Sequence, residues 1–99
     1  MKLPFEIDLN GKTAVVTGGA GVLCSAFARI LGACGAKIAV LDLNRDAANE
    51  VAESIVKQGG KAIGVEANVL DRNSLLKARD RVNHELGTCD ILINGAGGN

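Results

Sequence analysis

Short apolar runs alternate along this chain with longer segments in which apolar residues recur every three or four positions. The short runs predict strands that are covered on both faces, because such strands are apolar throughout. The periodic segments predict amphipathic helices. Strands are expected at 12–17, 37–42, 61–67 and 90–94. Helices are expected at 22–34 and 45–58, and a third helix, capped by Asp71 or Asn73, should run to about Leu86.

Apolar faces and end signals support the three predicted helices. The third helix is expected to turn Leu75, Ala78, Val82 and Leu86 inward. Asn44 is expected to cap the second helix, and Gly35 to end the first in the left-handed conformation. The apolar residues that recur at helical spacing in the first helix are Val22, Leu23, Ala26, Phe27, Ile30 and Leu31.

The order β-α-β-α-β-α-β, with short connections, predicts a parallel sheet, because crossovers between parallel strands are right-handed. The expected fold class is α/β: a Rossmann-type, doubly wound sheet in three layers, with strand order 3-2-1-4. The fourth strand would then lie at an apolar edge with no neighbour. Residues 1–99 are therefore predicted to be the N-terminal, dinucleotide-binding half of a single Rossmann domain.

The composition excludes several classes of function. Apolar residues make up 47% of the 99 positions and charged residues 22%, which is typical of a soluble globular domain. The formal net charge is zero and the aromatic residues are only Phe5 and Phe27, so no nucleic-acid partner is expected. No apolar run is long enough for a membrane span or a signal core, and a cytoplasmic location is expected.

Cysteine and histidine give little sign of a metal site. Cys24, Cys34 and Cys89 have no Cys-x-x-Cys spacing, and free, reduced thiols are expected. His84 is the single histidine and is expected on the solvent side of the third helix. No metal is predicted.

A glycine-rich segment joins the first strand to the first helix: Thr17, Gly18, Gly19, Ala20, Gly21, Val22 and Leu23. A helix N-terminus has unpaired N–H groups and a partial positive charge, which attract phosphate. Glycines let the backbone approach a pyrophosphate without a Cβ clash. The alternative is simply a tight turn between strand and helix.

Asp42 ends the second strand, about twenty residues after the glycines, where a carboxylate can accept both ribose hydroxyls of an adenosine. Its charge would repel a 2′-phosphate and favours NAD over NADP. Two alternatives remain: Asp42 only caps or turns the chain, or Arg45 holds a 2′-phosphate. Asn44 lies beside Asp42 and is included among the candidate cofactor contacts.

Two further candidate segments follow the third and fourth strands. In the first, an asparagine amide can pair with an adenine edge; in the second, small residues leave room for a cofactor and Asn94 can tie two strand ends together. All the candidates lie at carboxyl ends of strands, where open α/β sheets bind ligands. The two segments are Ala67-Asn68-Val69 and Asn94-Gly95-Ala96-Gly97.

These landmarks resemble, in order and spacing, those of the short-chain dehydrogenase/reductase family over essentially the whole chain. The common branch has Thr-Gly-x-x-x-Gly-x-Gly, and here Val22 and Cys24 stand at its last two glycines. Gly95 replaces the second asparagine of the Asn-Asn-Ala-Gly motif, and Asn68 replaces a usual aspartate. The extended, epimerase-like branch fits Gly18 and Gly21, but the other landmarks favour the common branch.

The glycine turn and the end of the chain look like the D-mannonate oxidoreductase (fructuronate reductase) group of that family. The resemblance implies hydride transfer between NAD(H) and a sugar acid, in a homo-oligomer, tetramer or dimer. The family's catalytic Ser, Tyr and Lys have no counterpart here, since the chain has no tyrosine and ends before the serine-bearing strand. No activity is expected of the chain alone, and a non-catalytic nucleotide-binding or oligomerisation module is the alternative.

Overall fold

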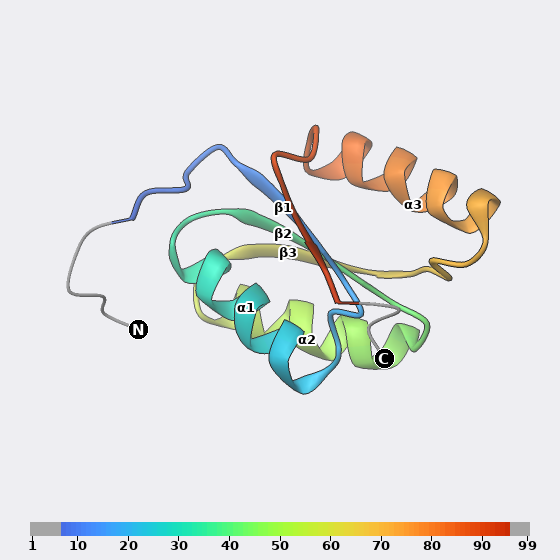
Figure 1. Ribbon diagram of the computed structural model, residues 1–99. Helices are drawn as coiled ribbons and strands as arrows, with labels where there is room; N and C mark the ends of the chain where they lie inside the picture. The colour runs from blue at the N-terminus through green and yellow to red at the C-terminus, as the bar shows by residue number, and fades with distance from the viewer. Residues whose placement is uncertain (1–6, 96–99) are drawn as a thin grey trace.

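Four parallel strands and three helices alternate along the chain in the computed structural model, which describes residues 7–95 (Figure 1). The predicted element order is confirmed, with ends that differ by no more than one residue. The elements are β1 (Thr13–Thr17), α1 (Val22–Ala33), β2 (Lys37–Asp42), α2 (Arg45–Lys57), β3 (Lys61–Glu66), α3 (Arg72–Glu85) and β4 (Ile91–Asn94).

The sheet has the predicted strand order, β3-β2-β1-β4, and every pair is parallel. Thr17, at the end of β1, lies opposite Leu41 in β2 and Asn94 in β4. Asp42 lies opposite Glu66 at the end of β3. All four strands therefore finish at the same edge of the sheet, which brings the loops that follow them together.

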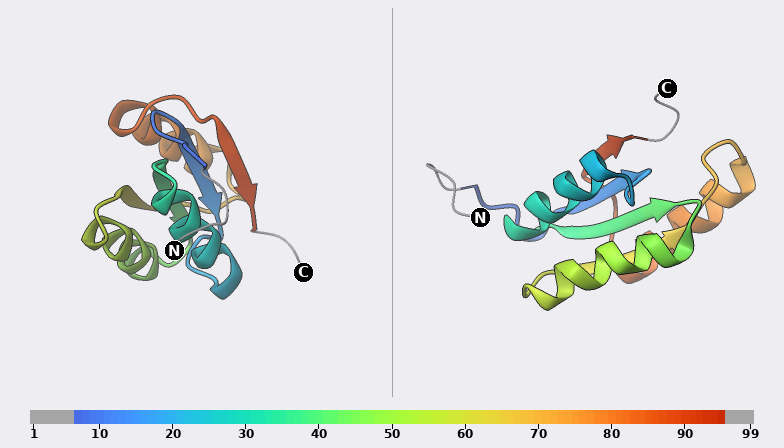
Figure 2. Two further views of the ribbon diagram at one scale, coloured as in Figure 1. Left: turned by 90° about the vertical axis from the view of Figure 1, so that its left-hand side faces the viewer. Right: turned by 90° about the horizontal axis from the view of Figure 1, so that it is seen from below.

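The predicted three layers are confirmed: α1 and α2 cover one face of the sheet and α3 covers the other (Figures 1 and 2). Alternate strand residues feed two apolar clusters. The cluster under α1 and α2 includes Val16, Ile38 and Val40, and the cluster under α3 includes Ala39 and Leu41. The sheet is thus the buried middle layer that fixes where each strand end lies.

The first helix leaves the larger apolar residues of its first half exposed, while Leu31 near its end packs against the core. Val22 is 93% exposed and Leu23 67% exposed, whereas Ser25, Ala28 and Gly32 are buried. The helix packs too closely for a larger inner face, since a Cβ at Gly32 would lie 2.9 Å from Ile55 Cγ2. The sheet side of α1 is therefore its small-residue face, and the recurring apolar residues at its start point outward.

Helix ends follow the predicted signals. Asn44 caps α2 by accepting a hydrogen bond from the Ala47 N–H at 3.0 Å. Of the two candidates for α3, Asp71 is the cap. Gly35, after α1, has φ +101°, the left-handed conformation that glycine adopts without strain.

Replacing Asp71 with alanine should lower the free energy of unfolding by about 1 kcal/mol. The Asp71 carboxylate accepts hydrogen bonds from the N–H groups of Asn73 and Ser74, and alanine leaves both without this partner. Urea unfolding followed by circular dichroism measures the change. Asp80→Ala, within the same helix at an exposed position, is the control, and equal losses for the two variants would contradict a capping role.

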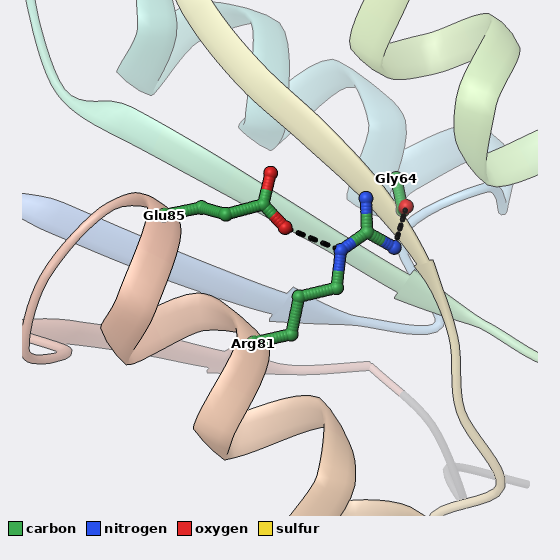
Figure 3. Close-up of polar contacts among 3 residues, drawn as sticks. All are labelled: Gly64, Arg81 and Glu85. Carbon is green, nitrogen blue, oxygen red and sulfur yellow. Dashed lines mark hydrogen bonds and ion pairs between the residues drawn. The ribbon is translucent and has the colours of Figure 1, made fainter.

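A polar contact fastens α3 to the sheet (Figure 3). Arg81 donates to the Gly64 carbonyl in β3 at 3.2 Å and to the Glu85 carboxylate one turn further along α3. Gly64 itself is closely packed, because a Cβ there would lie 2.7 Å from the backbone nitrogen of Asn49 in α2. Both faces of β3 are thereby held by helices.

The fourth strand is less covered than the other strands on the α3 side. Leu92 is 62% exposed, in agreement with the predicted apolar edge, while Ile91 and Ile93 pack against the cluster under α1 and α2. His84 is exposed on α3, as predicted. Within residues 7–95, no helix combines the length and the apolar character that a membrane crossing needs.

Candidate nucleotide-binding site

The glycine turn is held tightly against the end of the sheet. Gly18 has φ +64°, in the left-handed region that favours glycine. Gly19 donates its N–H to the Leu41 carbonyl of β2 at 3.0 Å, and Gly21 donates to the Gly18 carbonyl at 3.0 Å. The turn therefore has a fixed shape, and three of its residues, Gly18, Gly19 and Gly21, carry no side chain.

The start of α1 is open to an anion. Gly21 is its N-cap and provides no side-chain hydrogen bond, and the first turn contains no acidic residue. By contrast, the N-termini of α2 and α3 are each capped by a side chain. The free N–H groups and the partial positive charge at the start of α1 are suited to binding a phosphate.

Asp42 links the glycine turn to the end of β2. One carboxylate oxygen accepts a hydrogen bond from the Ala20 N–H at 3.1 Å, and the other accepts from the Asn44 N–H at 3.0 Å. The alternative role of Asp42, as a residue that turns the chain, is thus confirmed. The carboxylate can still bind a ligand, because each of its oxygens can accept more than one hydrogen bond.

A cavity of about 310 Å³ lies between Asp42 and the loop that follows β3. It brings together five of the predicted site residues, of which Ala67 is buried: Gly18, Asp42, Ala67, Asn68 and Val69. Leu43 and Leu70, which the sequence analysis did not name, also line it and are 69% and 91% exposed. Their signal in the sequence is an apolar residue in the loop that follows a strand: Leu43 comes directly after β2, and Leu70 lies between β3 and α3.

The loop after β3 is organised by Asn68. Its side-chain oxygen accepts from the Leu70 N–H at 3.0 Å, and its own N–H donates to the Ser74 hydroxyl at 2.9 Å. Asn68 therefore shapes its own loop, and an adenine contact stays a prediction. Asn44 does not line this cavity, and its side chain caps α2.

The ends of β1 and β4 are tied together, as predicted from Asn94. The Thr17 hydroxyl donates to the Asn94 side-chain oxygen at 2.8 Å, and the Gly95 N–H donates to the Thr17 carbonyl at 3.1 Å. Ala96 and Gly97, the other predicted residues of this motif, lie outside the described residues. Gly95 is exposed beside the first turn of α1.

Comparison with known proteins agrees with this arrangement. The family model described as short chain dehydrogenase matches residues 12–99. The chain belongs to the short-chain dehydrogenase family. The resemblance drawn from the glycine turn and the strand-end motifs is thereby confirmed, and so is the Rossmann-type fold.

Two bacterial relatives cover nearly all of this short-chain dehydrogenase sequence. An uncharacterized oxidoreductase of Bacillus subtilis, UxuB, is 48% identical over 97 residues, which are 98% of this chain and 35% of the relative. An uncharacterized oxidoreductase of Haemophilus influenzae is 46% identical over 99 residues, which are 100% of this chain and 35% of the relative. The chain thus spans about a third of the length of these relatives.

Solved structures of the family superpose closely on the chain. A candidate D-mannonate oxidoreductase from Haemophilus influenzae, crystallised with bound NAD, has a TM-score of 0.91 at 47% identity. The match covers 94% of this chain and 33% of that one. The hydroxysteroid dehydrogenase of Escherichia coli has a TM-score of 0.87 at 35% identity, over 92% of this chain and 39% of that one.

Proposed function

We propose that residues 1–99 form the N-terminal, dinucleotide-binding part of an NAD-dependent oxidoreductase. The observation that carries this proposal is the convergence of the open α1 N-terminus, the Asp42 carboxylate and the 310 Å³ cavity at one edge of the sheet. The fit is specific in shape, since neither Gly18 nor Gly21 places a Cβ between the backbone and a ligand. The structural relative with bound NAD supports the same assignment.

The chain's own residues would bind and orient the cofactor. The first N–H groups of α1 would hold the pyrophosphate, and Asp42 would accept hydrogen bonds from the ribose hydroxyls of the adenosine. Asn68 and Val69 would flank the adenine in the cavity. NAD supplies the hydride acceptor at its nicotinamide ring. The roles of Thr17, Asn94 and the residues after it are to leave space for the nicotinamide half and to fix the strand ends around it.

NAD is favoured over NADP by the placement of charge. The Asp42 carboxylate faces the cavity, and its negative charge would oppose a 2′-phosphate in the position of the ribose hydroxyls. Arg45 is exposed at the start of α2, and among residues 7–95 it makes no hydrogen bond or ion pair that would fix it toward the cavity. The alternative in which Arg45 selects NADP therefore has less support.

The proposed reaction is hydride transfer between NAD and an alcohol or carbonyl substrate, with a sugar acid of the D-mannonate/D-fructuronate type as the substrate. Similarity to the candidate D-mannonate oxidoreductase supports this choice. The catalytic serine, tyrosine and lysine would be supplied outside residues 1–99. We also propose a homo-oligomer, dimer or tetramer, and a reducing compartment such as the cytoplasm, which suits three free thiols.

Isothermal titration of the full-length protein with NAD and with NADP tests the cofactor assignment. We expect NAD to bind with a dissociation constant in the micromolar range and NADP to bind at least about tenfold more weakly. The formation of NADH with D-mannonate, followed by ultraviolet absorbance, tests the reaction. NAD binding without turnover of any sugar acid would favour the alternative of a non-catalytic nucleotide-binding module, and failure to bind either dinucleotide would refute the proposal.

A further inference from the structure

Cys24 and Gly95 are two departures from the family pattern that meet in the structure. Cys24 stands where the turn pattern has its third glycine, and Gly95 stands where the strand-end motif has its second asparagine. A Cβ at position 95 would lie 2.0 Å from the Cys24 Sγ, far inside any real contact distance. The Cys24 side chain therefore occupies the space that a side chain at position 95 would need.

Gly95 has little freedom to move away from the helix. Its N–H donates to the Thr17 carbonyl at 3.1 Å, and the preceding residue, Asn94, accepts from the Thr17 hydroxyl at 2.8 Å. A Cβ on Gly95 would also lie 3.0 Å from the Thr17 carbonyl oxygen. Because β1 is paired on both sides, its end cannot yield, and the helix side must adjust to any larger residue at 95.

On the helix side, the obstacle is a single atom. The Cys24 Cβ would be 3.5 Å from a Cβ at 95, an ordinary contact, so the Sγ is the only atom of Cys24 that clashes. Rotation of the Sγ is limited, because helical residues avoid one of the three χ1 rotamers. Cys24 also packs against the apolar cluster under α1 and α2, so a shift of its side chain disturbs that packing as well.

We propose that Cys24 and Gly95 form a compensating pair that sets the spacing between the first turn of α1 and the end of β4. Through this spacing the pair positions the N–H groups of α1 that would hold the cofactor pyrophosphate. This second step rests on the proposed function, whereas the steric coupling does not. Cys24 is a positioning residue here: its thiol acts through the helix backbone.

A double-mutant cycle in the full-length protein tests the pair: wild type, Gly95→Ala, Cys24→Ala and the double variant. We expect Gly95→Ala to lower the thermal midpoint by about 3–6 °C and to weaken NAD binding about fivefold or more. Cys24→Ala removes the Sγ and keeps a good helix former. The double variant should recover most of both losses, with a remainder from the Thr17 carbonyl.

The matched control is Cys34→Ala combined with Gly95→Ala, since Cys34 lies at the opposite end of α1 and should restore nothing. Equal losses from Gly95→Ala with and without Cys24 would overturn the pair. If the thermal midpoints show coupling between the two substitutions but the NAD affinity is the same in all variants, the contact only contributes packing, and its positioning role is overturned. A wild-type protein that binds no NAD would refute the proposed function, while the cycle of thermal midpoints would still decide the steric coupling.

Discussion

The Asp42→Ala variant should bind NAD roughly 10- to 100-fold more weakly than the wild-type protein, because it loses charge-assisted hydrogen bonds to the ribose hydroxyls. Discrimination against NADP should fall as well, since the negative charge that opposes a 2′-phosphate is gone. The carboxylate also holds the Ala20 and Asn44 N–H groups, so part of the loss comes from a looser glycine turn. Isothermal titration with both dinucleotides measures the two effects.

Two further variants separate these contributions. Asp42→Asn has nearly the same shape and retains one acceptor oxygen, but it has no charge. This variant should therefore preserve the glycine turn better than Asp42→Ala does. Asp46→Ala removes an exposed carboxylate from the first turn of α2, away from the cavity, and should change NAD affinity less than about twofold. If Asp42→Ala is folded by circular dichroism and binds NAD as wild type does, Asp42 makes no cofactor contact.

The architecture could be predicted because short local patterns and one rule of topology determine it. An asparagine before an apolar stripe marks the start of α2 at Asn44, and the apolar run Ile91-Leu92-Ile93 marks β4. Right-handed crossovers then place β4 beside β1 and β3 beyond β2. Since all the strands run the same way, the candidate residues had to collect at one edge of the sheet.

Packing faces and double roles could not be predicted in the same way. Apolar periodicity indicates which helix residues share a face, but not that α1 approaches the sheet on its small residues Ser25 and Ala28. The sequence also does not tell how a polar side chain divides its hydrogen bonds. Asn68 shapes its own loop and Asp42 holds the glycine turn, in addition to any ligand that they bind. These features depend on distances between segments far apart in the chain.

The Gly19→Ala variant should lower the free energy of unfolding by about 2–3 kcal/mol, the usual effect of overfilling a closely packed site. A Cβ on Gly19 would lie 2.7 Å from Val40 Cγ1 and 2.8 Å from the Val16 carbonyl oxygen. Val40 is completely buried in β2 and Val16 in β1, so neither can withdraw at low cost. The glycine must then move outward, away from its hydrogen bond to the Leu41 carbonyl.

The Gly19→Ala variant should also bind NAD more weakly than the wild-type protein, because Gly19 connects the sheet to the open start of α1. Gly21→Ala, in the same turn, is the matched comparison: its Cβ would lie 3.3 Å from the Gly18 carbonyl, a tight contact at ordinary backbone angles. This change should cost less than about 1 kcal/mol, as a moderate N-cap substitution does. Urea unfolding of both variants measures the difference. A Gly19→Ala variant as stable as Gly21→Ala would show that the turn can shift outward freely, contrary to a rigid phosphate-binding loop.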